Sequence, residues 1–127
     1  MKIDPRSHIP IYLQIAEGVR AAVAAGLYRP GEALPSLRAL AIDIQVNPNT
    51  VQRAYDELER EGVVYSQRGK GLFVAEQGTT SAQLRAQDGV RRAFDEGIRA
   101  GRAAGMRAEQ VRDIFEAAID HIAKAGS

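Results

Sequence analysis

The sequence has no cysteine and only two histidines, and both shortages narrow the chemistry that it can perform. Without cysteine it can build neither a disulfide framework nor a thiolate metal site, which suits a reducing cytosol. His8 and His121 are far apart in the sequence and lack supporting ligand types, so we expect no metal site. No nucleophile–base arrangement, phosphate-binding loop or paired-carboxylate pattern stands out. We therefore expect a protein that is not an enzyme and needs no cofactor.

Long hydrophobic runs are also missing from the sequence. No apolar stretch approaches the roughly 18 residues that a membrane-spanning helix needs. The N-terminus does not have the charged and then apolar layout of a secretory signal. The sequence therefore predicts a cytoplasmic protein without a membrane partner.

An excess of basic charge is missing as well. The net charge is +1, and residues 1–76 carry nine Lys or Arg and nine Asp or Glu. A clearly basic domain is the usual mark of a nucleic-acid-binding protein. The neutral balance slightly favours a protein-interaction scaffold, so a DNA-binding interpretation depends on where the charges lie.

The first half of the chain has a clear helical pattern. Apolar residues recur at three- and four-residue spacing in residues 11–25, which is typical of one buried helical face. Ser36 is a good N-cap for a second helix over residues 37–45. Asn47 is a good N-cap for a third helix over residues 48–61, because proline is tolerated at its first position. The predicted buried face of the third helix is Val51, Ala54, Tyr55 and Leu58.

Two short β-prone runs follow, at residues 63–66 and 71–74, around the turn Gln67–Lys70. They predict a hairpin with a basic, glycine-containing tip. Ala33–Pro35 is long enough only for a minimal strand. The order helix, strand, helix, helix, hairpin makes residues 1–76 a predicted winged helix-turn-helix domain.

Residues 77–127 are expected to form a helical dimerisation domain, so the predicted fold is mainly α with one small β-hairpin wing. Gln77–Thr80 suggests a polar linker, and two helices separated near Gly105 follow it. Each helix has an apolar stripe, and a second copy of the tail is the simplest cover for both. The row Ala93, Gly97, Gly101 and Gly105 allows close helix packing, within one chain or between chains. The expected dimerisation residues are Phe94, Ile98, Gly101, Val111, Ile114, Phe115, Ala118, Ile119 and Ile122.

The helix-turn-helix formed by the second and third helices can place the third helix in the major groove of DNA. Asn and Gln side chains can pair with adenine, Arg with guanine, and Thr with thymine or phosphate. Basic residues at the hairpin tip can reach phosphates or the minor groove. Acidic residues fall on the later turns of the third helix, so the domain can be neutral in sum and still bind DNA. The expected DNA-binding residues are Arg38, Asn47, Asn49, Thr50, Gln52, Arg53, Arg68, Gly69 and Lys70.

Two of these positions also have ordinary structural interpretations. Arg53 could be a solvated helix arginine, and Arg38 could form an ion pair within the chain. Tyr55 is expected in the core rather than stacked on a base.

Four blocks of sequence carry a resemblance to a known family. They are PIYLQI at residues 10–15, LPSLRALA at 34–41, VNPNTVQRAY at 46–55 and RGKGLFV at 68–74. In this order and spacing they resemble the DNA-binding domain of GntR-family regulators, and they are most similar to the short YtrA-like subfamily. The match covers roughly residues 9–75.

The resemblance implies contact with the DNA backbone and bases by Arg38, Asn49, Thr50, Gln52 or Arg53, and contact by the hairpin tip. Some branches of the family have arginines where this chain has Pro48 and Gln52, so the operator sequence does not carry over. YtrA-like members resemble this chain in having a short helical tail that dimerises, and many repress transporter operons. The resemblance thus implies a homodimeric repressor of a nearby operon that binds an inverted repeat in double-stranded DNA. It names no small-molecule effector, and a scaffold that does not bind DNA remains the alternative.

Overall fold

A computed structural model describes residues 1–125 of the chain. The chain divides into two compact units, Met1–Gln87 and a second unit that starts at Asp88. In the part of the chain that the structure describes, no helix is long and apolar enough to cross a membrane.

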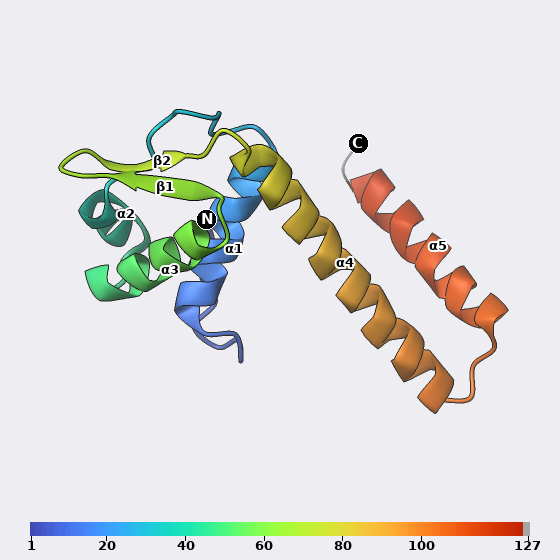
Figure 1. The fold of residues 1–127 in the computed structure, drawn as a ribbon. Helices are drawn as coiled ribbons and strands as arrows, with labels where there is room; N and C mark the ends of the chain where they lie inside the picture. Colours follow the sequence, from blue (N-terminus) through green and yellow to red (C-terminus); the bar gives the residue numbers. More distant parts are fainter. Residues whose placement is uncertain (126–127) are drawn as a thin grey trace. The chain divides into compact units, whose positions relative to one another are not determined.

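Three helices build the core of the first unit: α1 (Ile11–Ala24), α2 (Leu37–Ile44) and α3 (Pro48–Arg60). Helix α3 packs against both of the others (Figure 1). Its predicted apolar face is buried, and Val51, Ala54 and Leu58 have no exposed surface. Helix α1 contributes its own buried face, which consists of Ile15, Ala16, Val19 and Val23.

The capping residues predicted for α2 and α3 are confirmed. The Ser36 hydroxyl accepts a hydrogen bond from the Ala39 amide at 3.1 Å. The Asn47 side-chain oxygen accepts one from the Asn49 amide at 2.8 Å, and Pro48 occupies the first position of α3. These caps satisfy amides that have no partner within the helix, so the turn between the two helices is fixed by local chemistry.

The predicted hairpin is an antiparallel pair, β1 (Val64–Gln67) and β2 (Gly71–Val74). Val64 lies opposite Val74, and Gln67 lies opposite Gly71. The minimal strand expected near residue 33 is a single bridge between Ala33 and Phe73. This hairpin is the wing of the first unit (Figure 1).

The prediction of a polar linker at Gln77–Thr80 is wrong, because α4 (Gly78–Ala103) already begins at Gly78. Gly78 and Ala82 are buried, whereas Thr80 is exposed. The small residues pack inward and the polar residues face outward. This helical turn therefore has the small and polar composition that is typical of a linker. The first unit consequently extends through the first turns of α4 to Gln87.

In the second unit, the rest of α4 pairs with α5 (Ala108–Ala125). The rings of Phe94 and Phe115 meet edge to face with centroids 5.4 Å apart. At buried Gly101, a Cβ would lie 2.8 Å from Cγ2 of Val111, so this glycine allows the two helices to approach. Gly97, from the same predicted row, has no atom within 4 Å of its would-be Cβ.

Candidate nucleic-acid interface

The first two turns of α3 present a polar face to solvent. Asn49, Gln52 and Arg53 are exposed, and Thr50 is half-buried. On the opposite face, the Tyr55 hydroxyl donates a hydrogen bond to the carbonyl of Pro35 at 2.9 Å. This bond ties α3 to the segment before α2, so it fixes the two helices of the helix-turn-helix relative to each other.

Tyr55 belongs to the core, as predicted, with 3% of its surface exposed. Burial, together with the nearby Tyr28, raises the pKa of Tyr55 to about 12. Its hydroxyl is therefore protonated, and able to donate to Pro35, over the whole neutral range.

Arg53 does not extend freely into solvent, because its guanidinium carbon lies 3.9 Å from the centroid of the Tyr12 ring. A cation over an aromatic face is stabilised by about 0.5–1 kcal/mol at an exposed site. Tyr12 comes from the first turn of α1, so it orients Arg53 from a different helix. No sequence pattern indicates this pair, because it forms only when α1 packs beside α3.

The side chains of Gln52 and Asn47 each form one hydrogen bond within the chain. The Gln52 amide donates to a carboxylate oxygen of Asp56 at 2.8 Å, which leaves its carbonyl oxygen and one N–H available. An adenine edge needs one acceptor and one donor of this kind. The Asn47 side-chain oxygen caps α3, and both of its amide N–H groups remain for another partner.

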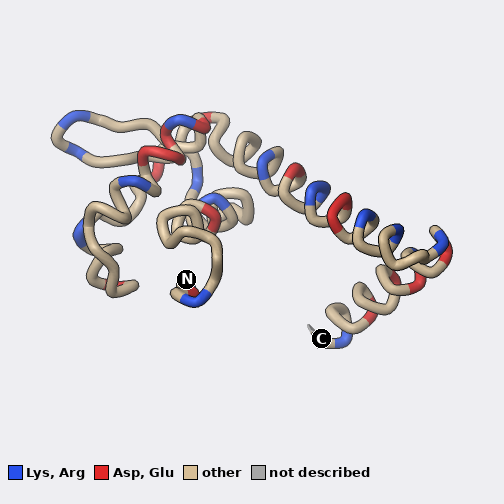
Figure 2. Tube along the Cα trace, turned by 90° about the horizontal axis from the view of Figure 1, so that it is seen from below, with Lys and Arg blue, Asp and Glu red and all other residues tan. Residues whose placement is uncertain are grey.

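The basic residues predicted to contact DNA are exposed, and none has an acidic partner among residues 1–125. Within residues 1–125, no ion pair involves Arg38, Arg53, Arg68 or Lys70. The intrachain ion pair considered for Arg38 is thus not formed. The loop of the β1–β2 hairpin carries Lys and Arg but no Asp or Glu (Figure 2).

The acidic residues of α3, in contrast, have partners inside the domain. Glu57 pairs with Arg60, and Glu59 accepts a hydrogen bond from the Ser66 hydroxyl at 2.9 Å. The charge of Glu57 is therefore compensated without DNA, and the Glu59 carboxylate has a hydrogen-bond donor within the domain. A domain with equal numbers of acidic and basic residues can in this way present mainly basic and amide groups on one surface.

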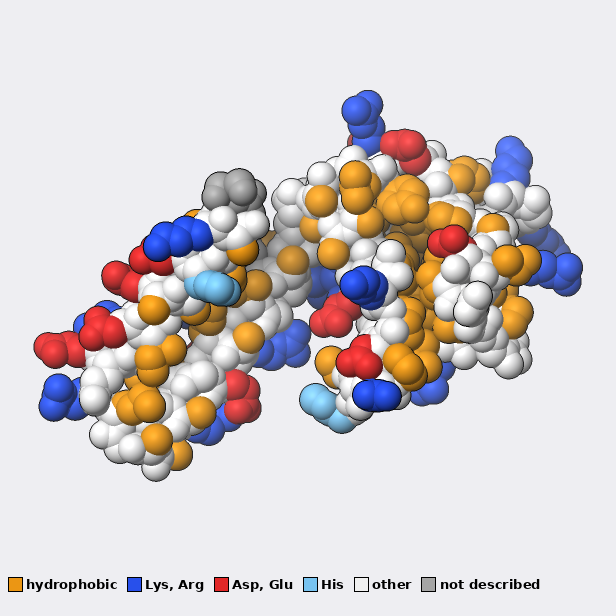
Figure 3. Space-filling view, turned by 180° about the vertical axis from the view of Figure 1, so that it is seen from behind, with side chains coloured by type: hydrophobic (Ala, Val, Ile, Leu, Met, Phe, Trp, Pro, Cys, Tyr) orange, Lys and Arg blue, Asp and Glu red, His pale blue; other side chains and the backbone are white. Residues whose placement is uncertain are grey.

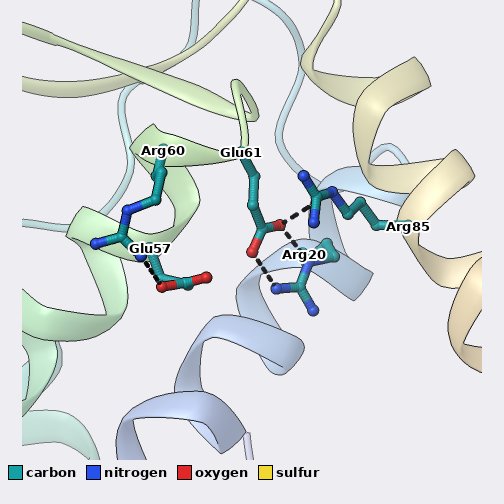
Figure 4. Close-up of polar contacts among 5 residues, drawn as sticks. All are labelled: Arg20, Glu57, Arg60, Glu61 and Arg85. Atoms are coloured by element: carbon teal, nitrogen blue, oxygen red, sulfur yellow. Dashed lines mark hydrogen bonds and ion pairs between the residues drawn. The ribbon is translucent and has the colours of Figure 1, made fainter.

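Glu61, the residue after the end of α3, lies between two arginines. Its side chain is 5% exposed, and its two oxygens accept hydrogen bonds from Arg20 Nε at 2.8 Å and Nη2 at 2.6 Å. Arg85 Nε lies 4.0 Å from the same carboxylate. Figure 4 shows the Glu61 carboxylate between the two guanidinium groups, which come from α1 and α4. Glu61 follows the last residue of α3, so the cluster joins three helices.

The residues predicted for dimerisation fall into two groups. Gly101 is buried and Val111 is half-buried in their contact with each other within the chain. The large side chains are 42–69% exposed, and Figure 3 shows hydrophobic side chains on the surface of α4 and α5. These exposed residues are Phe94, Ile98, Ile114, Phe115, Ile119 and Ile122. Ala118 is exposed as well.

The arrangement in the first unit defines a class of protein. A capped helix-turn-helix with a polar second helix, followed by a hairpin with a basic loop, is a winged helix-turn-helix, a fold that binds DNA.

The family model described as "Bacterial regulatory proteins, gntR family" matches residues 11–74, and the chain belongs to this family of transcription regulators. The chain is 47% identical over 81 residues to the HTH-type transcriptional repressor YtrA of Bacillus subtilis strain 168. The matched region is 64% of this chain and 62% of that relative, so the chain spans about three-fifths of the relative's length.

Solved structures agree with this assignment. A GntR family transcriptional regulator from Listeria monocytogenes superposes with a TM-score of 0.79 at 30% identity, covering 90% of this chain and 97% of the other. The DNA-binding domain of AraR, in complex with operator ORE1, superposes with a TM-score of 0.53 at 27% identity. That match covers 58% of this chain and 90% of the AraR chain.

Proposed function

We propose that this chain is a transcriptional repressor that binds an inverted-repeat operator in double-stranded DNA as a homodimer. The observation that carries the proposal is the set of exposed amide and guanidinium groups on α3 and the hairpin loop, whose cations have no acidic partner in the described residues. Groups of this kind match base edges and phosphates respectively.

Each element has a distinct role in this proposal. Helix α3 enters the major groove, where Asn49, Gln52 and Arg53 read base edges and Thr50 contacts thymine or phosphate. Arg38 on α2 contacts the DNA backbone. In the wing, Arg68 and Lys70 contact phosphates or the minor groove, and Gly69 lets the backbone come close.

The tail supplies the second half of the binding unit. Six large hydrophobic side chains of α4 and α5 are 42–69% exposed, although the two helices already pack on each other. Burying such a side chain contributes about 1.5–3 kcal/mol, so a self-complementary contact with a second copy is strongly favoured. A dimer holds two winged domains at high effective concentration for two half-sites.

The regulatory direction rests on similarity. The relative YtrA is named a transcriptional repressor. A dimer bound across a promoter would exclude RNA polymerase, and we propose that the regulated genes form a nearby operon, such as a transporter operon.

The proposal is tested by measuring affinity for duplex DNA as a function of salt concentration. Each phosphate contact contributes roughly 0.9 to the slope of log affinity against log salt. We expect a steep slope for the full chain and a shallower one for Arg68→Ala with Lys70→Ala. Arg99→Ala is a matched control, because Arg99 pairs with Glu96 on an exposed face of α4. A chain that binds no duplex at any salt concentration would instead be a protein-interaction scaffold.

A further inference from the structure

The first turn of α4 lies so close to the base of the wing that position 78 has no room for a side chain. A Cβ at Gly78 would lie 2.4 Å from the carbonyl oxygen of Val63 and 2.9 Å from Cγ1 of Val74. The first obstacle is backbone, so it cannot rotate away as a flexible side chain could. Packing on the hairpin therefore requires glycine at this position.

The carbonyl that blocks position 78 also closes the hairpin. It accepts a hydrogen bond from the Ala75 amide at 3.0 Å, directly beyond the last pair of the ladder, Val64 with Val74. The Ala75 carbonyl in turn accepts one from the Gly78 amide at 2.8 Å. Val63, Ala75 and Gly78 thus link the base of the wing to the start of α4 through backbone alone.

Three further contacts hold the first turns of α4 on the helical core. Ala82 is completely buried. The side-chain amide of Gln83 donates a hydrogen bond to the backbone carbonyl of Ala24 in α1 at 3.3 Å. Arg85 lies beside Glu61, the carboxylate that also binds Arg20 (Figure 4). Because these contacts lie on the next two turns, a clash at position 78 cannot be relieved simply by moving the start of α4 away.

We infer that Gly78 is a positioning residue for the wing. The start of α4, seated on Val63 and Val74, holds the hairpin so that Arg68 and Lys70 face DNA. This inference rests on the proposed function and extends it, because it assigns the first turn of α4 to DNA binding as well as to the tail. Gly78 itself does not touch DNA.

The test compares full-length Gly78→Ala with Gly89→Ala. Both substitutions add one methyl group to α4, but position 89 has no atom within 4 Å of the new Cβ. The first readout is hydrogen exchange of the Ala75 amide in the free protein. Because Gly78→Ala displaces the carbonyl that accepts this amide, we expect exchange to become faster by about tenfold. Gly89→Ala should leave it unchanged.

The second readout is the salt dependence of DNA binding. Gly78→Ala should reduce the slope by about 3.6, since each of the two protomers loses two phosphate contacts and each contact contributes roughly 0.9. Arg68→Ala with Lys70→Ala should reduce it by the same amount. Adding Gly78→Ala to that double variant should then reduce it no further, because the contacts are already gone. Additive reductions would overturn the inference.

The remaining outcomes separate the inference from the proposed function. If Gly78→Ala and Gly89→Ala agree in both readouts, the wing does not depend on Gly78, while DNA binding by the parent chain stands. If the parent chain binds no DNA, the proposed function fails, and the exchange comparison still decides whether Gly78 holds the hairpin. If circular dichroism shows that Gly78→Ala is unfolded, Arg85→Ala becomes the test variant and Arg99→Ala becomes its control. Equal Ala75 exchange in those two variants would overturn the inference.

Discussion

Arg53 and the basic residues of the wing are expected to affect DNA binding differently. Arg53→Ala should weaken binding to the preferred operator by about 1–3 kcal/mol and relax the preference at one base position, because a bidentate arginine discriminates between bases by that amount. Arg68→Ala or Lys70→Ala should weaken binding to all sequences alike. Competition binding with operators substituted at single positions measures the difference.

If Arg53→Ala lost affinity equally for every duplex, Arg53 would contact phosphate rather than a base. Tyr12→Phe is a useful companion variant, because it keeps the ring on which the Arg53 guanidinium lies. It should retain the base preference of the parent chain, whereas Tyr12→Ala should lose part of it.

Tyr55 is expected to make stability depend on pH in the alkaline range. Its pKa is about 12 in the folded chain and 10.0 in its ordinary state, so the unfolded chain loses the proton first. The contribution of Tyr55 to the free energy of unfolding is thus fully present below pH 10. It falls by up to about 2–3 kcal/mol as the pH rises toward 12. Tyr55→Phe removes the hydrogen bond to Pro35, so its free energy of unfolding should be lower by about 1 kcal/mol at neutral pH. Above pH 10 its stability should depend less on pH than that of the parent chain. Urea denaturation of both chains across this range would show parallel curves if Tyr55 did not titrate as described.

At the scale of single residues, local chemistry was predictable and contacts between distant segments were not. Ser36 and Asn47 cap the next helix through atoms only two or three residues away, so the sequence contains the whole interaction. The stacking of Arg53 on Tyr12 joins α1 to α3, and the inward turn of Glu61 depends on Arg20. Such pairs are set by tertiary packing, which a pattern of residue types along the chain does not encode.

At the scale of elements, the first turns of α4 belong structurally to the winged unit. A chain ending at Gln87 should be folded and monomeric, with weaker operator affinity than the full chain. A chain ending at Glu76 lacks Gly78, which lies against Val63 and Val74 at the base of the wing, and it also lacks the buried Ala82. It should be less stable than the longer fragment by about 2 kcal/mol or more, because two valines become partly exposed.

Urea denaturation and sedimentation of the two fragments check this expectation. Equal stability of both fragments would show that the start of α4 does not support the core. A fragment ending at Gln87 that still dimerises would remove the tail from its proposed role.

The element pattern shows where sequence reasoning succeeded and why it stopped. Helices α1, α2 and α3 and the hairpin follow from apolar spacing, caps and turn residues, which are properties of short segments. Gln77–Thr80 has the glycine and hydroxyl residues of a linker, yet Gly78 is in a helix. Composition alone predicts a linker, but the lack of a side chain at Gly78 allows close packing on Val63.

At the scale of the whole molecule, neutral net charge and DNA binding are compatible. The chain has 17 basic and 16 acidic residues, but Glu57 and Glu61 form ion pairs within the domain, whereas the cations of the proposed interface form none within residues 1–125. The distribution of charge, rather than its sum, therefore sets the attraction to phosphates. In the proposed dimer, this surface is doubled and the binding unit has a two-fold axis.

The most direct test of the central claim is the selection of bound sites by the full-length chain from random duplex DNA. A two-fold dimer presents two α3 helices to DNA, so we predict enrichment of an inverted repeat. Its half-site centres should be about one helical turn, roughly 10–10.5 base pairs, or a multiple of a turn apart. Enrichment of a single asymmetric motif would contradict binding as a symmetric dimer. The absence of any enriched sequence would contradict operator recognition itself.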